Sequence, residues 1–386
     1  MDGPGENSDV HKTIRFEHLT VDTQGPENPH TKAVGDISGN GLVDIGVASS
    51  NGGPLVWYAS PNWTKHIVAP AGSWSCDAKL MDVDGDGYLD ILISEWYTRN
   101  RLEWYENPSP RGNPSTDPWR RHVIGSPRAH DIQVGDIDGD GQWEIVTRTQ
   151  GADGDHILVW KRDVEKPDAS TWNQRAIDCP PGEGLATGDI DDDGKLEVII
   201  GGRWYDPPKD VLRGPWQEYP FADWPRDASA CVTDLNSDGR LDVVPARSEG
   251  PHKISWFQVS PDPRSERWSE HVVDDSVDYA HSLAVGDIDN DGHLDIVTAE
   301  MHQSSRKGVL AYLNAGHAIE WRRQVVANTG SHKLCVGDVN GNGRLDLVGA
   351  NWSGDYQPVE VWLDLGGRRE KRSEFHELHR HPRALS

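Results

Sequence analysis

The sequence lacks long apolar runs and has little methionine. Only three of its 386 residues are Met, and no segment approaches the roughly 20 consecutive apolar residues that a membrane-spanning helix needs. We therefore expect no membrane span. Residues Met1 to Glu6 have neither the basic start nor the apolar core of a secretion signal. The sequence as given thus predicts a cytoplasmic protein, or a secreted or periplasmic one whose leader has been trimmed.

Basic residues are also scarce, with 38 Lys and Arg against 63 Asp and Glu, which gives a net charge of −25. A chain this acidic repels phosphate backbones, so nucleic acid is not expected as a partner. The four cysteines are not closely paired, and we expect buried free thiols rather than a disulfide framework. Abundant Gly, Pro and Trp between short apolar runs favour β-structure. The sequence leaves the oligomeric state open.

One acidic motif occurs seven times, with first residues 45 to 54 positions apart. Each copy has oxygen-bearing side chains at positions 1, 3 and 5, glycine at position 6 and an acid at position 9. The residues at positions 1, 3, 5 and 9 are Asp36, Ser38, Asn40 and Asp44; Asp82, Asp84, Asp86 and Asp90; Asp136, Asp138, Asp140 and Glu144; Asp189, Asp191, Asp193 and Glu197; Asp234, Asn236, Asp238 and Asp242; Asp287, Asp289, Asp291 and Asp295; Asp338, Asn340, Asn342 and Asp346.

Each repeat contains four short strand patterns: an apolar run before the acidic loop, a second after it, a Trp-bearing third and a fourth that begins with Trp. Seven such units predict an all-β, seven-bladed β-propeller over residues 1–364, with blades starting near residues 30, 76, 130, 183, 228, 281 and 332. The fourth-strand pattern also occurs at residues 13–20, which we expect to close the last blade. Residues 365–386 are expected to form a C-terminal extension.

The acidic loops have the ligand pattern of a calcium site, because oxygen donors at positions 1, 3 and 5 and a final acid surround a glycine turn. The seven motifs, counting Asp192, hold 2 + 4 + 4 + 5 + 3 + 4 + 2 = 24 acids, and −25 + 24 = −1, so nearly all the excess charge lies in them. We predict up to seven structural Ca²⁺ ions between the first and second strands. Such loops favour an extracytoplasmic protein. The first and last loops, which have fewest acids, should bind most weakly.

This acidic loop between apolar strands resembles the FG-GAP repeat family, also called VCBS, over about residues 30 to 364. The resemblance implies a propeller and calcium, in a family that includes adhesion heads, lectins and enzymes. The Trp-Tyr-Glu-Asn-Pro segment from Trp104 to Pro108 and the Trp-x-x-His-Val strands are similar to the propeller of the aldos-2-ulose dehydratases. That resemblance implies an enzyme that dehydrates sugars.

Propeller topology predicts where a functional site lies. An inner strand runs into its acidic loop, so its first residues lie on the opposite face near the axis, where the second strands also end. Equivalent positions of the seven blades therefore converge on one funnel. Six residues before the loops stand His30, Cys76, His130, Glu183, Ala228, His281 and His332. In contrast, His66, His122 and His271 recur on outer strands, where a structural role is expected.

We expect a carbon–oxygen lyase, either a sugar dehydratase or a polysaccharide lyase, because β-elimination needs a base near neutral pKa and positive charge near the developing enolate. The candidate catalytic residues are His30, His130, His281, His332 and Tyr279. The candidate substrate-binding residues are Arg148, Arg203, Arg247, Glu95, Trp96, Glu300, His302, Trp204, Trp352 and Asn351. His281, His332 and His30, with Glu300 and His302 beside them, are candidates to hold a catalytic ion such as Zn²⁺ or Mg²⁺.

Two other hypotheses remain open. In the first, a non-catalytic, calcium-dependent propeller uses its funnel and tryptophans to bind glycans or a partner protein. In the second, the propeller is a purely structural scaffold that binds neither glycans nor a partner. The funnel residues differ from blade to blade, which suits one asymmetric site better than seven equal ones. We therefore expect a carbohydrate as substrate or ligand.

Overall fold

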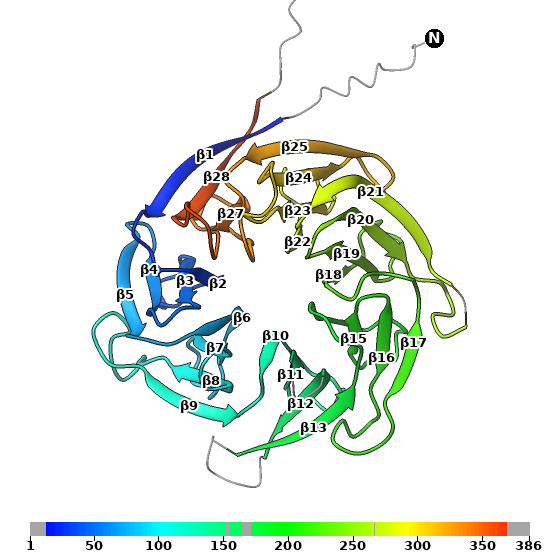
Figure 1. The fold of residues 1–386 in the computed structure, drawn as a ribbon, viewed down its shortest axis with the longest axis horizontal. Helices are drawn as coiled ribbons and strands as arrows, with labels where there is room; N and C mark the ends of the chain where they lie inside the picture. Colours follow the sequence, from blue (N-terminus) through cyan, green and yellow to red (C-terminus); the bar gives the residue numbers. More distant parts are fainter. Residues whose placement is uncertain (1–12, 152–154, 164–170, 266, 369–386) are drawn as a thin grey trace, which may run out of the picture.

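The computed structural model describes residues 13–151, 155–163, 171–265 and 267–368, and within these ranges every helix or strand assigned is a β-strand. The strands form seven antiparallel, four-stranded sheets arranged as blades around a central axis (Figure 1). The predicted all-β, seven-bladed propeller is thus confirmed. The described residues contain no helix of sufficient length and apolar character to span a membrane.

Six blades follow the chain from the axis outwards, and the seventh combines both ends of the described chain. Blades one to three are β2 (Pro29–Gly35), β3 (Asp44–Ser49), β4 (Leu55–Ala59) and β5 (Thr64–Ala69); β6 (Trp74–Met81), β7 (Asp90–Glu95), β8 (Arg101–Glu106) and β9 (Arg120–Gly125); and β10 (Ala129–Gly135), β11 (Glu144–Thr149), β12 (His156–Arg162) and β13 (Trp172–Asp178). Blades four and five are β14 (Ala186–Gly188), β15 (Glu197–Ile200), β16 (Arg203–Asp206) and β17 (Gln217–Pro220); and β18 (Ala228–Thr233), β19 (Asp242–Arg247), β20 (Pro251–Gln258) and β21 (Ser269–Asp278). Blades six and seven are β22 (Ser282–Gly286), β23 (Asp295–Ala299), β24 (Val309–Asn314) and β25 (Trp321–Ala327); and β26 (Cys335–Gly337), β27 (Asp346–Gly349), β28 (Val359–Arg368) and β1 (Thr13–Asp22).

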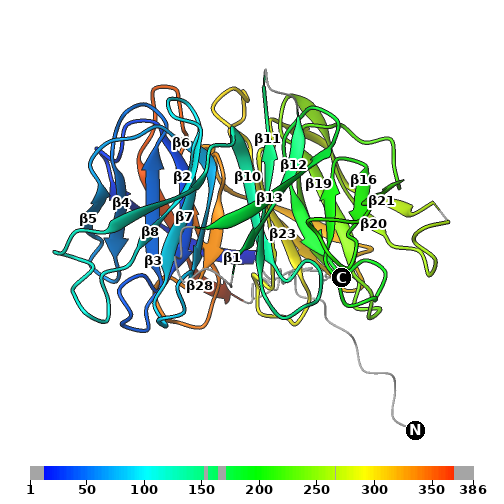
Figure 2. The same ribbon diagram turned by 90° about the horizontal axis from the view of Figure 1, so that it is seen from below.

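The core is divided among the interfaces between neighbouring blades. Seven clusters of buried apolar side chains occur, and each joins two adjacent blades. The second strands lie deepest; β3, β7 and β11 are buried at every residue. This placement explains their continuous apolar runs, because a strand covered on both faces has no need of the alternation seen in half-exposed strands. Figure 2 shows the blades side by side, from a direction at 90° to that of Figure 1.

Outer strands are fixed by histidine–tryptophan stacks. His66, His122 and His271 lie opposite the third-strand tryptophans of their own blades, with ring centroids 4.6, 4.2 and 4.1 Å apart. In the seventh blade His18 of β1 lies opposite Trp362 of β28 and stacks on it at 5.6 Å. Thus β1 repeats the contact that the fourth strands make in other blades.

The ring closes through β1, which pairs with β28 from Thr13 opposite Arg368 to Asp22 opposite Val359. Figure 1 shows β1 as the outermost strand of the blade that contains β28. The last strand extends to Arg368, beyond the expected limit of the propeller at residue 364, because its pairing with β1 continues that far. The rest of the expected C-terminal extension, residues 369–386, lies outside the described residues.

Closure is reinforced by Asp22, at the end of β1. Its Oδ2 accepts hydrogen bonds from Tyr58 Oη and Lys65 Nζ of the first blade, both at 2.9 Å. Burial alone would raise the pKa of Asp22. Hydrogen bonds from these donors, of which the bond from Lys65 has the larger effect, lower the pKa below its ordinary value. The carboxylate form is therefore stabilised in the folded state.

We predict that Asp22→Asn lowers the free energy of unfolding by about 1 kcal/mol at neutral pH, the usual scale of a partly exposed charged hydrogen bond. Because the folded pKa is lowered, the contribution is present above about pH 4 and disappears as the pH falls through the folded pKa. Urea unfolding of the wild type and the variant at pH 7 and pH 3 measures the loss of unfolding free energy at each pH. Glu17→Gln, exposed on the same strand, is the control; an equal loss at both pH values would contradict the prediction.

Candidate functional site

Four histidines meet on the axis, at the starts of inner strands from four blades. His30 comes from the first blade, His130 from the third, His281 from the sixth and His332 from the seventh, and each is at most 4% exposed. The ring centroids of His30 and His332 lie 4.4 Å apart, those of His281 and His332 4.1 Å, and those of His130 and His281 6.2 Å. The structure thus brings together four of the five candidate catalytic residues.

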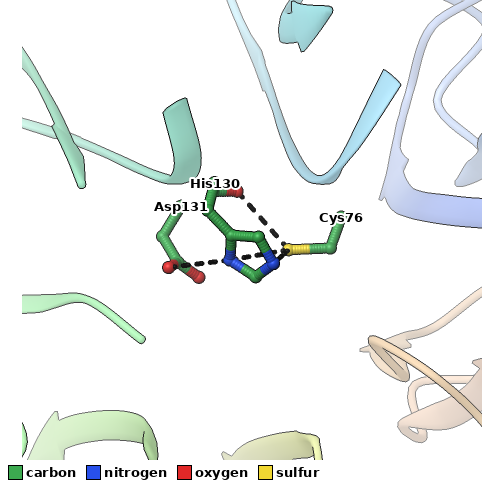
Figure 3. Close-up of side chains that lie close together, drawn as sticks. All are labelled: Cys76, His130 and Asp131. Carbon is green, nitrogen blue, oxygen red and sulfur yellow. Dashed lines mark hydrogen bonds and ion pairs between the residues drawn. The ribbon is translucent and has the colours of Figure 1, made fainter. Parts of the chain in front are cut away.

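On one side of this group, His130 contacts a thiol and a carboxylate (Figure 3). Its Nδ1 is 3.0 Å from Asp131 Oδ2, and Cys76 Sγ of the second blade lies 3.5 to 3.6 Å from both ring nitrogens. Burial lowers the pKa of His130, but the neighbouring Cys76 and Asp131 outweigh burial and raise it well above its usual value. All four cysteines are free thiols, but only Cys76 is buried, whereas Cys179, Cys231 and Cys335 are half-buried.

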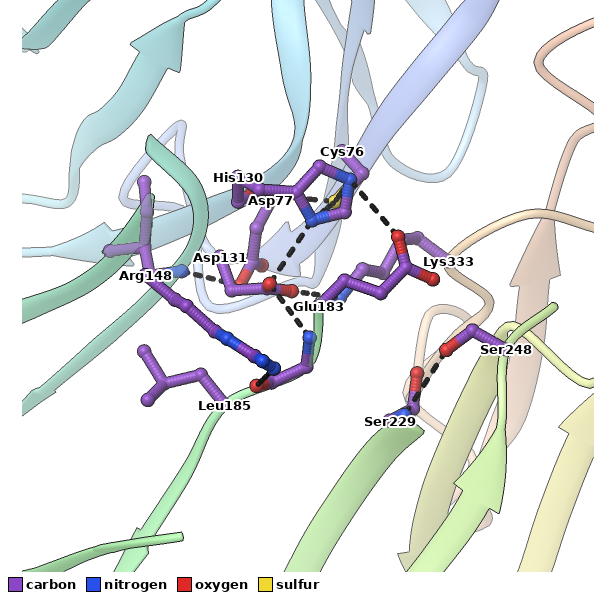
Figure 4. A network of polar contacts seen from close by, with 12 residues as sticks. Cys76, Asp77, His130, Asp131, Arg148, Glu183, Leu185, Ser229, Ser248 and Lys333 are labelled. Carbon is purple, nitrogen blue, oxygen red and sulfur yellow. Dashed lines mark hydrogen bonds and ion pairs between the residues drawn. The ribbon is translucent and has the colours of Figure 1, made fainter. Parts of the chain in front are cut away.

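Glu183 of the fourth blade connects two of the histidines, and Figure 4 shows its contact with one of them, His130. Its carboxylate oxygens are 3.6 Å from His130 Nε2 and 3.0 Å from His281 Nε2. Burial alone would raise the pKa of Glu183. The two histidines, of which His281 has the larger effect, hold this pKa well below its ordinary value. The result is a buried group of two imidazoles and one carboxylate from three different blades.

Two lysines reach the same region, of which Lys32 is buried and Lys333 half-buried. Lys333 Nζ lies 3.3 Å from Asp131 Oδ1, and the surrounding Cys76 and acids outweigh burial and raise its pKa. Lys32 Nζ donates to the carbonyls of Pro29, His30 and Ala350, and burial lowers its pKa to about 7. Both lysines line a cavity of about 380 Å³ that continues along the axis from His281.

His30 and His332 face a less polar environment. His332 Nδ1 lies 3.2 Å from the carbonyl of His30, and His30 Nδ1 lies 3.4 Å from the carbonyl of Trp74. A carbonyl oxygen only accepts, so both rings carry their proton on Nδ1 and keep a lone pair on Nε2. Burial, with the neighbouring positive groups, lowers the pKa of both rings well below the usual value. They are therefore neutral imidazoles.

Aromatic rings surround the histidines at the mouth of the channel. The ring centroid of Trp352 lies 5.2 Å from that of His30 and 5.7 Å from that of His302. The ring centroids of Trp96 and His130 lie 5.2 Å apart. Tyr97 is 44% exposed, and its ring centroid lies 6.0 Å from that of His30 and 4.6 Å from that of Trp96. Aromatic faces of this kind suit a sugar ring.

A second cavity, of about 640 Å³, lies between blades three, four and five. Its lining includes Arg148, Arg203 and Arg226, with Trp224 and His252. Of the three arginines expected to bind substrate, Arg148 and Arg203 lie here, whereas Arg247 is absent from the lining and its Nη1 donates to the Pro251 carbonyl. Arg203 also pairs with Glu218.

Arg148 is occupied by the protein itself. It is 1% exposed, and its guanidinium donates to the carbonyls of Gly184, Arg226 and Pro180 at 2.9, 3.3 and 3.0 Å. Its expected role in substrate binding is corrected to a structural one, because these loop carbonyls need a buried donor.

Trp204 does not lie at the funnel. Only Gly201 and Gly202 separate β15 from β16, so Trp204 is the third-strand tryptophan of its blade, fully buried and stacked on Tyr219 at 4.6 Å. The expectation failed because the short turn shifts the register relative to the other repeats.

Three further candidates make hydrogen bonds within loops, Glu300 and Glu95 in their own loops and Asn351 to the connection between β25 and β26. Glu300 is fully buried and accepts from Ser304 Oγ and the Gly308 amide; Glu95 accepts from Thr98 Oγ1; and Asn351 Nδ2 donates to the Thr329 carbonyl. Glu300 therefore braces residues 301–308 rather than contacting a ligand. Tyr279 is half-buried in the turn between β21 and β22, with a φ of 51°.

The sequence interpretation missed Asp131, Lys32 and Lys333. Asp131 and Lys333 each follow a funnel histidine, and ordinary strand alternation would direct them to the other face of the sheet. Lys333 has a φ of 48° and precedes β26, so alternation does not apply to it. For Asp131, the pairing register of β10 with β11 shifts between Ala129 and Asp131. Neither irregularity has a signal in the sequence.

The acidic loops lie at the opposite ends of the inner strands. Asp36 and Asp82, at position 1, accept amide hydrogen bonds from position 6, whose glycines have φ of 86° and 92°. The acids at position 9 are buried; burial, with neighbouring acids, raises the pKa of Asp242 to about 7 and of Glu197 to about 8. Asp242 Oδ1 and Glu197 Oε1 are buried without a hydrogen-bond donor among the described residues. Such orphaned oxygens fit a cation.

One loop contains a cation of the protein itself. Lys161 Nζ lies 2.7, 2.8 and 2.9 Å from oxygens of Asp138, Asp140 and Glu144 in the third blade. In the fourth blade, Arg264 pairs with Asp191 and Lys195 with Asp193. In the fifth blade, Arg240 lies 3.3 Å from Asp238, so at least three of the seven loops have a counter-ion from the protein itself.

Comparison with known proteins agrees with the repeats. A model of the FG-GAP-like repeat matches residues 36–93, 82–147 and 234–298, so the chain contains FG-GAP-like repeats. Aldos-2-ulose dehydratase of Phanerodontia chrysosporium is 27% identical over 126 residues, which cover 28% of this chain and only 14% of that enzyme.

Solved structures share the fold alone. The BBS1N structure in complex with ARL6DN aligns with a TM-score of 0.58 at 10% identity, over 91% of this chain and 96% of that one. A protein from Lactobacillus plantarum aligns with a TM-score of 0.49 at 13% identity, over 79% of this chain and 87% of that one.

We predict that Arg148→Met lowers the free energy of unfolding by about 3 kcal/mol, because three buried carbonyls lose their donor. Arg203→Met, at a half-exposed ion pair, should cost less than about 1 kcal/mol. Urea denaturation of both variants tests this difference. Equal, small losses would contradict the structural role given to Arg148.

Proposed function

We propose that this propeller is a carbohydrate-active eliminase, a carbon–oxygen lyase that acts on sugars at the central channel. The main support is the stacked pair His30 and His332, whose Nε2 lone pairs are available while a cluster of charged groups lies beside them. The partial likeness to a sugar dehydratase supports the same class. The aromatic mouth supports a sugar ring as the ligand.

In the proposed reaction, the imidazole of His332 or His30 removes a proton from the carbon next to a carbonyl or carboxylate. The electron pair forms an enolate, and the carbon–oxygen bond at the next carbon then breaks. The Lys333 ammonium supplies positive charge for the enolate. The leaving oxygen takes a proton from Tyr97, whose pKa is raised to about 12 by burial and nearby negative charge, so the phenol is protonated.

Calcium binding by the acidic loops is the second part of the proposal. Buried, orphaned carboxylate oxygens at position 9 and oxygen donors at positions 1, 3 and 5 support it. When bound, the ion neutralises these acids and braces the turn between the first and second strands. No step of the elimination involves these loops, which lie at the far ends of the inner strands.

We predict that the wild-type protein produces a conjugated double bond from a uronate-containing glycan or a keto- or anhydro-sugar, seen as rising ultraviolet absorbance. His332→Asn retains a donor for the His30 carbonyl but has no Nε2 lone pair, so kcat should fall about 100-fold or more. His271→Phe, which keeps a ring on Trp256, is the control and should leave kcat unchanged.

Two outcomes would contradict the elimination. Full activity of His332→Asn would exclude this histidine as the base, and full activity of both His332→Asn and a matching His30→Asn would exclude the pair. A flat trace over the whole substrate panel, with sugar binding seen by calorimetry, would favour the non-catalytic glycan-binding propeller.

We predict that chelation of calcium lowers the thermal midpoint by several degrees, because several sites lose their ion and each loss of about 1 kcal/mol shifts the midpoint by up to about 2 °C in a chain larger than 250 residues. Added Ca²⁺ should restore the midpoint. Lys161→Met should add calcium affinity at the third loop, where the ammonium competes with the ion. A midpoint that chelation leaves unchanged would show that the loops do not need the ion.

A further inference from the structure

The group formed by His130, Glu183 and His281 is suited to bind a metal ion. Its three donors, one from each residue, lie within 4.8 Å of one another, and each residue is at least nine-tenths buried. We propose that His130 Nε2, the Glu183 carboxylate and His281 Nε2 bind one divalent ion of the zinc type. The expected set of His281, His332 and His30 shares only His281 with this group, which is completed by His130 and Glu183, whereas His30 and His332 stack on one another.

The spacing of the donors supports a metal. Glu183 lies 3.6 Å from His130 Nε2 and 3.0 Å from His281 Nε2. Ligands bound tetrahedrally to zinc at 2.0–2.1 Å are about 3.3 Å apart, between these two values. Two imidazoles with one carboxylate also favour zinc over calcium or magnesium, which prefer oxygen donors alone.

The surroundings of His130 provide a second, independent argument. Asp131 Oδ2 lies 3.0 Å from His130 Nδ1, which directs Nε2 towards Glu183 and His281. Asp131 is itself held by the Gly184 amide at 2.8 Å and by Lys333 (Figure 4). Zinc-binding histidines usually have such a carboxylate on their other nitrogen.

An open position remains for a substrate oxygen. Of the three donor residues, His281 lines the axial cavity, so a ligand in that cavity would approach the ion from the side of His281. The role of the ion, though not its binding, rests on the proposed elimination: it would polarise the carbonyl or carboxylate oxygen as the neighbouring carbon loses its proton. It would then act together with Lys333.

The test uses the full chain, stripped by chelation and dialysed against Zn²⁺ with excess Ca²⁺ to fill the acidic loops. We expect one equivalent of zinc per chain, and with Co²⁺ a visible absorption band typical of a tetrahedral site. A His130→Ala/His281→Ala variant should lose both. Asp131→Asn should bind zinc about 10- to 100-fold more weakly. His302→Ala, at the mouth, is the control and should bind as the wild type does.

Circular dichroism and the thermal midpoint show whether each variant folds, and Glu183→Gln replaces the double variant if that one does not. Wild-type protein that retains no zinc, or a folded ligand variant that retains a full equivalent, would overturn the site. Zinc binding without turnover of any sugar would contradict the elimination only. Full turnover by zinc-free protein would overturn the role of the ion.

Discussion

The pairing of β1 with β28 is the constraint on which the candidate site depends. It joins the seventh blade to the first, and a cluster of buried side chains from both blades, including Val361 and Val47, packs across the same interface. His332 and His30 belong to these two blades and stack across the axis at 4.4 Å. If the ring opened at this interface, the pair would separate. The first strand is therefore part of the site, although it contributes no side chain to it.

Buried acids at the two faces of the propeller have pKa values shifted in opposite directions. The loop ends hold buried acids with raised pKa values, such as Asp90 and Asp295, each near 7. At the other end, acids such as Asp131 and Glu183 have lowered pKa values because histidines and Lys333 lie beside them. Burial is similar at both ends, so the difference comes from the neighbouring cations. A buried acid without one is costly unless it is protonated or binds an ion.

The sequence predicted the fold because the repeat and the strand periodicities depend on local residues. The acidic motif, the third-strand Trp and the fourth-strand His each recur at a fixed place in the blade. The convergence of His30, His130, His281 and His332 followed from topology alone, since equivalent positions of a closed ring must meet. The register of the fourth blade was not predictable, because only the two-residue link Gly201–Gly202 places Trp204 in the third strand.

Side-chain partners were harder to predict than positions. Arg148 and Glu300 have the chemistry of ligand-binding residues, but backbone groups of neighbouring loops satisfy them. Loop conformation determines which carbonyls and amides are left unpaired, and the sequence does not encode it in a readable pattern. Asp131 and Lys333 show the converse, because irregular backbone brings them to the axis where regular alternation would not.

The two ends of the inner strands also differ in donor chemistry, and this difference argues that they serve different purposes. Every motif position at the loop end offers oxygen, which suits a hard ion that braces a turn. The axial end offers imidazole nitrogen and a thiol as well as the carboxylates of Asp131 and Glu183, beside a cavity that a ligand can enter. A brace for a hard ion needs only oxygen donors and no open position, whereas a reacting centre needs a position that a ligand can enter. The physical asymmetry of the blades therefore favours structure at one face and chemistry at the other.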